Sequence, residues 1–155
     1  MTKFSALCLL LIGLLSACST NTIDPAAEAE TTKARQAQQW LTGAAKWVVQ
    51  RASQNNEVYY ERGVQQPGEV DMEVVWLRFL PNNRFEVQFI SAAKPTELYY
   101  KIDGTTNELI VSQTADFARP LNWKTKLDNI REKSVDLFIQ EGDNDLVTLT
   151  LVPQE

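Results

Sequence analysis

Three patterns of apolar and polar positions follow one another along the 155-residue chain. Residues 4–15 are mostly apolar and include no charged side chain. Residues 26–41 place apolar side chains at the spacing of one helix face. From residue 46 onward, apolar and polar side chains alternate, which is typical of β-strands with one buried face. The chain therefore predicts a short apolar leader, one helix and a strand-rich domain.

The second pattern predicts a helix over residues 25–42. Asp24 can cap the first free backbone amides, and Pro25 fits the first helical turn. Gly43 is a typical residue for the end of such a helix. The predicted apolar face comprises Ala34, Ala37 and Leu41, with Trp40 beside it. We expect this helix to plug or flank the following domain, the alternative being that its first half is a disordered spacer.

The third pattern predicts a β-domain over residues 43–155. The predicted strands cover residues 46–50, 58–60, 74–79, 84–89, 98–102, 109–111, 121–127, 135–139 and 147–151. Turn residues separate several of them, as in Pro81-Asn82-Asn83, Asp103-Gly104 and Gly142-Asp143-Asn144. Short links favour antiparallel neighbours, so the pattern predicts an all-β meander of about eight strands, closed as a barrel or packed as a sandwich.

Composition excludes several classes of function. The net charge of −5 gives no general attraction for nucleic acid or anionic membranes. The sequence has no histidine and only two cysteines, Cys8 and Cys18. It therefore offers no recognisable nucleophile–base pair and no metal motif, and we expect neither an enzyme nor a cofactor. A run of acidic residues before one predicted strand is interpreted as a solvated loop: Glu61, Glu69, Asp71 and Glu73.

The leader has the features of an export signal. Lys3 provides a positive start, and the twelve residues 4–15 would rise about 18 Å as a helix. That length is too short for a bilayer core of about 30 Å, which favours a signal peptide over a transmembrane helix. Leu15-Ser16-Ala17-Cys18 resembles the lipobox of bacterial lipoproteins.

The lipobox resemblance implies how the chain matures. Residues 1–17 would be removed, a diacylglyceryl group would join the sulfur of Cys18, and its new amine would be acylated, typically with palmitate. Residues 18–24 would then form a short tether from a membrane to the helix. Ser19 resembles an outer-membrane sorting signal, which implies the outer membrane of a bacterial cell envelope. The alternative is an ordinary cleaved signal with an incidental cysteine.

The predicted domain resembles the lipocalin group, in particular small bacterial lipocalin-like lipoproteins. Residues 41–47 resemble its first-strand element, in which one residue separates a Gly from a Trp; here three residues separate them. Residues 76–85 resemble its β-turn-β element, and residues 98–111 resemble the next hairpin. Trp123 and the final strand pair complete a resemblance over residues 38–153. It implies a lipocalin-like antiparallel barrel of about eight strands.

The resemblance leads to a first hypothesis, in which the barrel binds a small apolar ligand. The candidate ligand-binding residues are Trp47, Trp76, Tyr100 and Trp123, and Tyr59, Tyr60 and Tyr99 are further candidates. Aromatic residues also fill strand faces without binding anything, and Trp47 is either a barrel-base residue or a general core residue. An eight-stranded barrel is wide enough for its own side chains or for one small ligand.

A second hypothesis is a non-enzymatic scaffolding lipoprotein with a filled barrel. The alternation of residues 74–79 places Val75 in the predicted core. Val74 and Trp76 then lie on the opposite face, as does Tyr99. Exposed apolar patches can bind partner proteins. The sequence identifies neither the ligand nor the partner.

Overall fold

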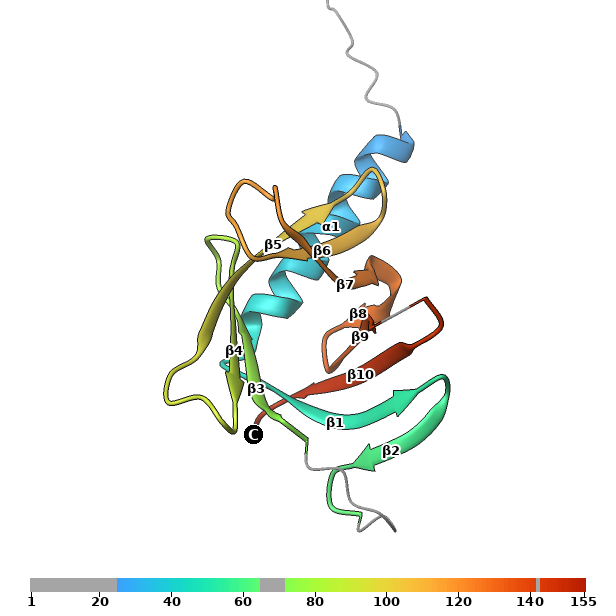
Figure 1. The fold of residues 1–155 in the computed structure, drawn as a ribbon. Coiled ribbons are helices and arrows are strands. Elements are labelled where there is room, and N and C mark those ends of the chain that lie inside the picture. The colour runs from blue at the N-terminus through green and yellow to red at the C-terminus, as the bar shows by residue number, and fades with distance from the viewer. Residues whose placement is uncertain (1–24, 65–71, 142) are drawn as a thin grey trace, which may run out of the picture.

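The computed structural model describes residues 25–64, 72–141 and 143–155. Cys18, the predicted tether and Asp24 lie outside these ranges, as does the part of the acidic loop that holds Glu69 and Asp71. The described chain consists of one helix followed by short strands (Figure 1).

The helix α1 (Pro25–Gly43) has the predicted bounds to within one residue. Ala37 and Leu41 are buried in the core, and Ala34 and Trp40 pack against it. The predicted apolar face is therefore confirmed. Residues 26–32 are helical but exposed, and the start of α1 extends past the β5–β6 hairpin (Figure 1).

Ten strands follow the helix. They are β1 (Trp47–Gln54), β2 (Glu57–Glu61), β3 (Val74–Phe79), β4 (Arg84–Phe89), β5 (Thr96–Asp103), β6 (Glu108–Ser112), β7 (Pro120–Lys126), β8 (Ile130–Arg131), β9 (Ser134–Gln140) and β10 (Leu146–Pro153). A 3-10 turn, η1 (Leu127–Asn129), joins β7 to β8. Nine of these strands coincide with predicted runs, and the two-residue β8 does not.

The strands close into a barrel. The ring runs β1, β3, β4, β5, β6, β7, β9 and β10, and β10 pairs with β1 to complete it. All neighbours in this ring are antiparallel. The short strands β2 and β8 lie outside the ring and pair with β1 and β9. The fold is therefore a closed eight-stranded antiparallel barrel preceded by a helix, as predicted, and not a sandwich.

Aromatic rings fill the end of the barrel that α1 covers. Phe79 stacks on Phe85 with ring centroids 4.6 Å apart, and Tyr100 meets Phe79 edge-on at 5.3 Å. Trp47 is fully buried, and its Nε1–H donates to the carbonyl oxygen of Leu41 at 3.0 Å. The last turn of α1 is thus joined to the start of β1, and buried aromatic rings occupy this half of the barrel.

Polar contacts fasten α1 to the same end. The hydroxyl of Tyr100 accepts a hydrogen bond from Nε2 of Gln38 at 2.5 Å and donates one to the carbonyl oxygen of Leu80 at 3.0 Å. Lys33 forms an ion pair with Asp128 of η1. The buried hydroxyl of Tyr100 therefore connects the helix to the β3–β4 turn through the barrel interior.

One predicted strand face is wrong. The pairing of β3 with β4 shifts register between Val74 and Trp76, which is a β-bulge. Val74 consequently packs against the core, whereas Val75 is 44% exposed on the outside. Strict alternation predicted the reverse, with Val75 inside and Val74 outside. It failed because a bulge adds one residue to the strand and shifts the alternation at that point.

We expect Tyr100→Phe to destabilise the fold by about 1–3 kcal/mol, because it leaves the Gln38 amide and the Leu80 carbonyl without their buried partner. The measurement is the free energy of unfolding in urea. Tyr99→Phe is the matched control, since that hydroxyl lies on the outside, 3.4 Å from Glu97. Its effect should stay within about 0.5 kcal/mol. Equal stability of Tyr100→Phe and wild type would contradict the role of this hydroxyl.

Candidate functional site: a pocket at the open end of the barrel

The barrel wall is weakest between β1 and β3. These strands pair at a single position, Trp47 with Leu77, near the end covered by α1. Farther along, residues 51–54 of β1 pair with β2 instead. The β1–β2 hairpin extends away from β3, as Figure 1 shows. The wall is therefore closed beside the helix and divided at the opposite end.

A pocket of about 310 Å³ lies at this divided end. Its lining residues come from the start of β3 and β10, the end of β4 and β9, and from β2 and β7. They are Tyr59, Met72, Glu73, Val74, Phe89, Trp123, Ile139, Glu141, Val147 and Leu149. All of these except the two glutamates belong to the core or pack against it. The pocket therefore enters the inner face of the barrel from the end opposite α1.

The pocket has an apolar interior and a polar rim. Val147 and Leu149 are buried core residues, 6% and 3% exposed. Trp123 is half-buried, and its ring meets Phe85 edge-on with centroids 6.3 Å apart. This contact separates the pocket from the aromatic cluster in the other half. The polar residues of the lining are Tyr59, Glu73 and Glu141, and both glutamates are exposed.

The pKa of Tyr59 depends on the burial and the charge at this rim. Burial raises the pKa of its phenol above the usual 10.0, and the nearby negative charge of Glu141 raises it further. Both effects disfavour the phenolate. Tyr59 is therefore a neutral hydrogen-bonding group at neutral pH, placed between an apolar interior and an acidic rim.

The four candidate ligand residues occupy three different places. Trp123 lines the pocket. Trp47 and Tyr100 lie in the filled half beneath α1, where their polar atoms bond to Leu41, Gln38 and Leu80, so neither lines this pocket. Trp76 is half-buried on the outer face. Trp47 is a fully buried core residue at the start of β1, which fits both of its interpretations.

Sequence patterns missed several pocket residues. Phe89 and Ile139 were assigned to inward faces, but nothing indicated that they lie at the open end. Met72 and Glu141 lie just outside their strands and were not singled out. These residues share one property, which is that each lies at the strand end farthest from the Trp47–Leu41 contact. This property could predict them only if the end of the barrel covered by the helix were already known.

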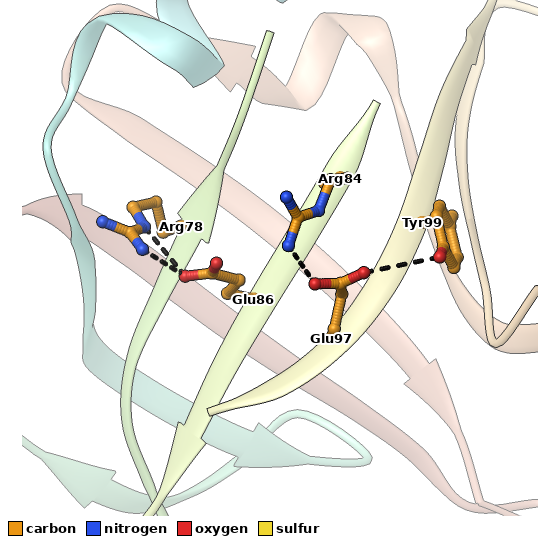
Figure 2. Close-up of polar contacts among 5 residues, drawn as sticks. All are labelled: Arg78, Arg84, Glu86, Glu97 and Tyr99. Atoms are coloured by element: carbon orange, nitrogen blue, oxygen red, sulfur yellow. Dashed lines mark hydrogen bonds and ion pairs between the residues drawn. The ribbon is translucent and has the colours of Figure 1, made fainter. Parts of the chain in front are cut away.

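The outer face of β3, β4 and β5 carries a ladder of ion pairs (Figure 2). Nε of Arg78 donates to Oε2 of Glu86 at 2.9 Å, in register across β3 and β4. Arg84 pairs with Glu97, which also accepts a bond from the hydroxyl of Tyr99 at 3.4 Å. These ion pairs join neighbouring strands across the outer face.

The same face holds Trp76 between two cations. Nζ of Lys46 lies 4.4 Å from the Trp76 ring centroid, and Cζ of Arg78 lies 5.7 Å from it. Trp76 thus has cation–π partners within the chain. Its neighbour Val75 is one of the exposed large apolar residues.

Other hollows lie on the outside of the barrel. One of about 600 Å³ lies along the outer side of β1 and the end of β10. It is lined by Val48, Gln50, Arg62, Lys133, Val152, Pro153, Gln154 and Glu155. It is larger than the barrel pocket but lacks aromatic side chains. The smaller barrel pocket is the better candidate ligand site, because core residues and three aromatic side chains line it.

Comparison with known proteins adds no assignment: no family model, curated protein or solved structure matches the chain. In the described part of the chain, no group of three or more Cys, Asp or Glu side chains is placed to hold a metal ion. Among the same residues, no helix combines the length and apolar character needed to cross a bilayer.

We expect the phenol of Tyr59 to titrate above pH 10.0, and Glu141→Gln to lower its pKa part of the way back. The absorbance difference between the wild-type chain and Tyr59→Phe isolates this tyrosinate. Above pH 10.0 the unfolded chain begins to lose the Tyr59 proton, whereas the folded chain keeps it up to the raised pKa. The contribution of Tyr59 protonation to the free energy of unfolding is therefore fully present below pH 10.0 and is lost as the pH rises through the raised pKa.

The matched control for this titration is Glu28→Gln, which removes an exposed carboxylate from the first turn of α1. It should leave the midpoint of Tyr59 unchanged. A midpoint that does not respond to Glu141→Gln either would show that the Glu141 carboxylate does not act on the rim.

Proposed function

We propose that this protein is a lipid-anchored lipoprotein of a bacterial cell envelope whose lipocalin-like barrel binds a small hydrophobic ligand without catalysing a reaction. The observation that carries the proposal is the pocket on the inner face of the barrel, at the end that α1 does not cover. Such a cavity combines apolar walls with a few polar groups, as ligand sites commonly do.

The size of the pocket supports a small ligand. Its volume of about 310 Å³ is at the lower end of the range of roughly 300–1,000 Å³ found for ligand pockets. It corresponds to about ten water molecules at ~30 Å³ each. The interior of an eight-stranded barrel is wide enough either for its own side chains or for one small ligand. The aromatic cluster fills the other half, so one ligand at the open end is the capacity that the fold supports.

The lipobox-like residues before Cys18 support the anchor. A thioether-linked diacylglyceryl group with an acylated amine holds a protein stably on a membrane, because each buried methylene contributes about 0.8 kcal/mol. The exposed first half of α1 fits a segment that leads from the anchor to the barrel. Ser19 supports the outer membrane as the location.

We favour the pocket over a partner site on the outer face. Trp76 is already in contact with Lys46 and Arg78, and the hydroxyl of Tyr99 with Glu97. A partner would have to displace or share these contacts. In contrast, the aromatic ring of Trp123 lines a cavity.

The anchor is tested with the two cysteines of the sequence. We expect Cys18→Ser to abolish incorporation of labelled palmitate and to release the protein from the membrane fraction. Cys8→Ser is the matched control and should keep both the label and the membrane location, because Cys8 lies in the segment proposed to be removed. Label retained by Cys18→Ser, or lost from Cys8→Ser, would contradict lipidation at Cys18.

The pocket is tested with two adjacent valines. In the full chain carrying Cys18→Ser, we expect saturable calorimetric binding of a long-chain alcohol. Val74→Phe should weaken it, because the larger ring occupies part of the pocket that Val74 lines. Val75→Phe makes the same change on the exposed side of the same strand and should bind like the parent. Equal binding by both variants would place the ligand elsewhere, and no saturable binding by the parent would refute the proposed function.

A further inference from the structure

The charges that line the pocket are all negative. Glu73 and Glu141 contribute carboxylates to its rim, and its lining includes no lysine or arginine. Neither carboxylate forms an ion pair within the described residues. Their backbones are held in place: the carbonyl of Glu73 accepts from the Ile90 amide at 2.8 Å, and the Glu141 amide donates to the Asp145 carbonyl at 2.9 Å.

From this geometry we infer that the pocket selects amphiphiles with a cationic head group, such as a long-chain amine or quaternary ammonium, over those with a carboxylate head group. The inference rests on the proposed function and names the ligand class for that pocket. The apolar tail would lie against Val147 and Leu149, and the head group would lie at the rim beside the two glutamates.

The loops around the open end strengthen the negative potential. Besides Glu73 and Glu141, the described loops at this end carry the carboxylates Asp116, Asp143 and Asp145, and Glu57 begins β2 beside them. The cations in the same loops are Arg62, Lys94 and Arg119, and none of them lines the pocket. Asp145 accepts bonds from the side-chain amides of Gln54 and Asn55, which leave its charge in place. A cation approaching this end is therefore attracted by more carboxylates than those in the lining.

The aromatic lining provides a second attraction for a cation. Tyr59, Phe89 and Trp123 come from three different strands and line the same cavity. Ring faces attract ammonium groups, and the attraction grows when water is excluded. An anionic head group meets the opposite conditions, because it would lie beside two carboxylates without a paired cation.

The raised pKa of Tyr59 is consistent with this potential. The Glu141 carboxylate disfavours a negative charge on the Tyr59 phenol, which lines the same rim. A carboxylate head group in that place would be disfavoured by the same field. The neutral hydroxyl remains available to a hydrogen-bonding head group.

The experiment compares three ligands that share one alkyl chain: a trimethylammonium, an alcohol and a carboxylate, each below its critical micelle concentration. Binding to the full chain carrying Cys18→Ser is measured by calorimetry at low and high salt. We expect the ammonium to bind about tenfold more tightly than the carboxylate at low salt, with the alcohol between them. Salt should narrow this difference, because the rim charges are exposed.

Variants assign the preference to the rim. The double substitution Glu73→Gln with Glu141→Gln should remove most of the difference between ammonium and carboxylate while leaving the alcohol affinity within about twofold. Glu28→Gln with Glu30→Gln is the control, since it removes as much charge from the exposed first half of α1. That variant should keep the preference.

The outcomes separate the inference from the proposed function. Equal affinities for the three ligands, tighter binding of the carboxylate, or a preference unaffected by the rim variants would overturn the charge selectivity and leave a hydrophobic pocket. Absence of binding by all three ligands would overturn the proposed function, and the selectivity with it.

Discussion

The packing of α1 across one end of the barrel determines what the rest of the molecule can do. The bond from Trp47 to the Leu41 carbonyl and the bond from Gln38 to Tyr100 fix the helix there. The rings of Phe79 and Phe85 then fill the space beneath it. Each half of a small barrel holds either side chains or a ligand. With one half filled, an internal site is confined to the other end.

The gap in strand pairing between β1 and β3 determines which residues line the pocket at that end. Because β1 pairs with β3 at one position and then with β2, the β1–β2 hairpin leaves the ring and brings Tyr59 to the pocket. The same division places Glu73 at the rim just before β3 begins. Apolar walls and acidic groups thus meet at this end because β1 changes its partner from β3 to β2. The acidic groups stay exposed at the rim, so the arrangement buries no charge.

The sequence predicted the local elements well, because helical and strand periods are local properties. Ala37 and Leu41 were assigned to the buried face by spacing alone. Val74 was misassigned because a bulge depends on the partner strand. The site was harder to predict: Trp76 and Tyr100 were chosen for their residue type, but the fold places one outside and the other in the filled half. The position of the helix determines which end of the barrel stays open. That position depends on contacts between residues far apart in the sequence, so local patterns do not predict it.

The positions of the anchor and the pocket relative to the barrel bear on where a ligand comes from. Gly104, in the β5–β6 turn, lies against Glu30 of α1, so the chain enters the helix beside the covered end. The pocket is lined from the opposite end of the strands. A seven-residue tether from Cys18 reaches at most about 25 Å. A chain anchored at Cys18 therefore enters the barrel from the side away from the pocket. Under the proposed anchor and the proposed ligand site, the ligand would arrive from the compartment or from a facing surface, and not from the bilayer.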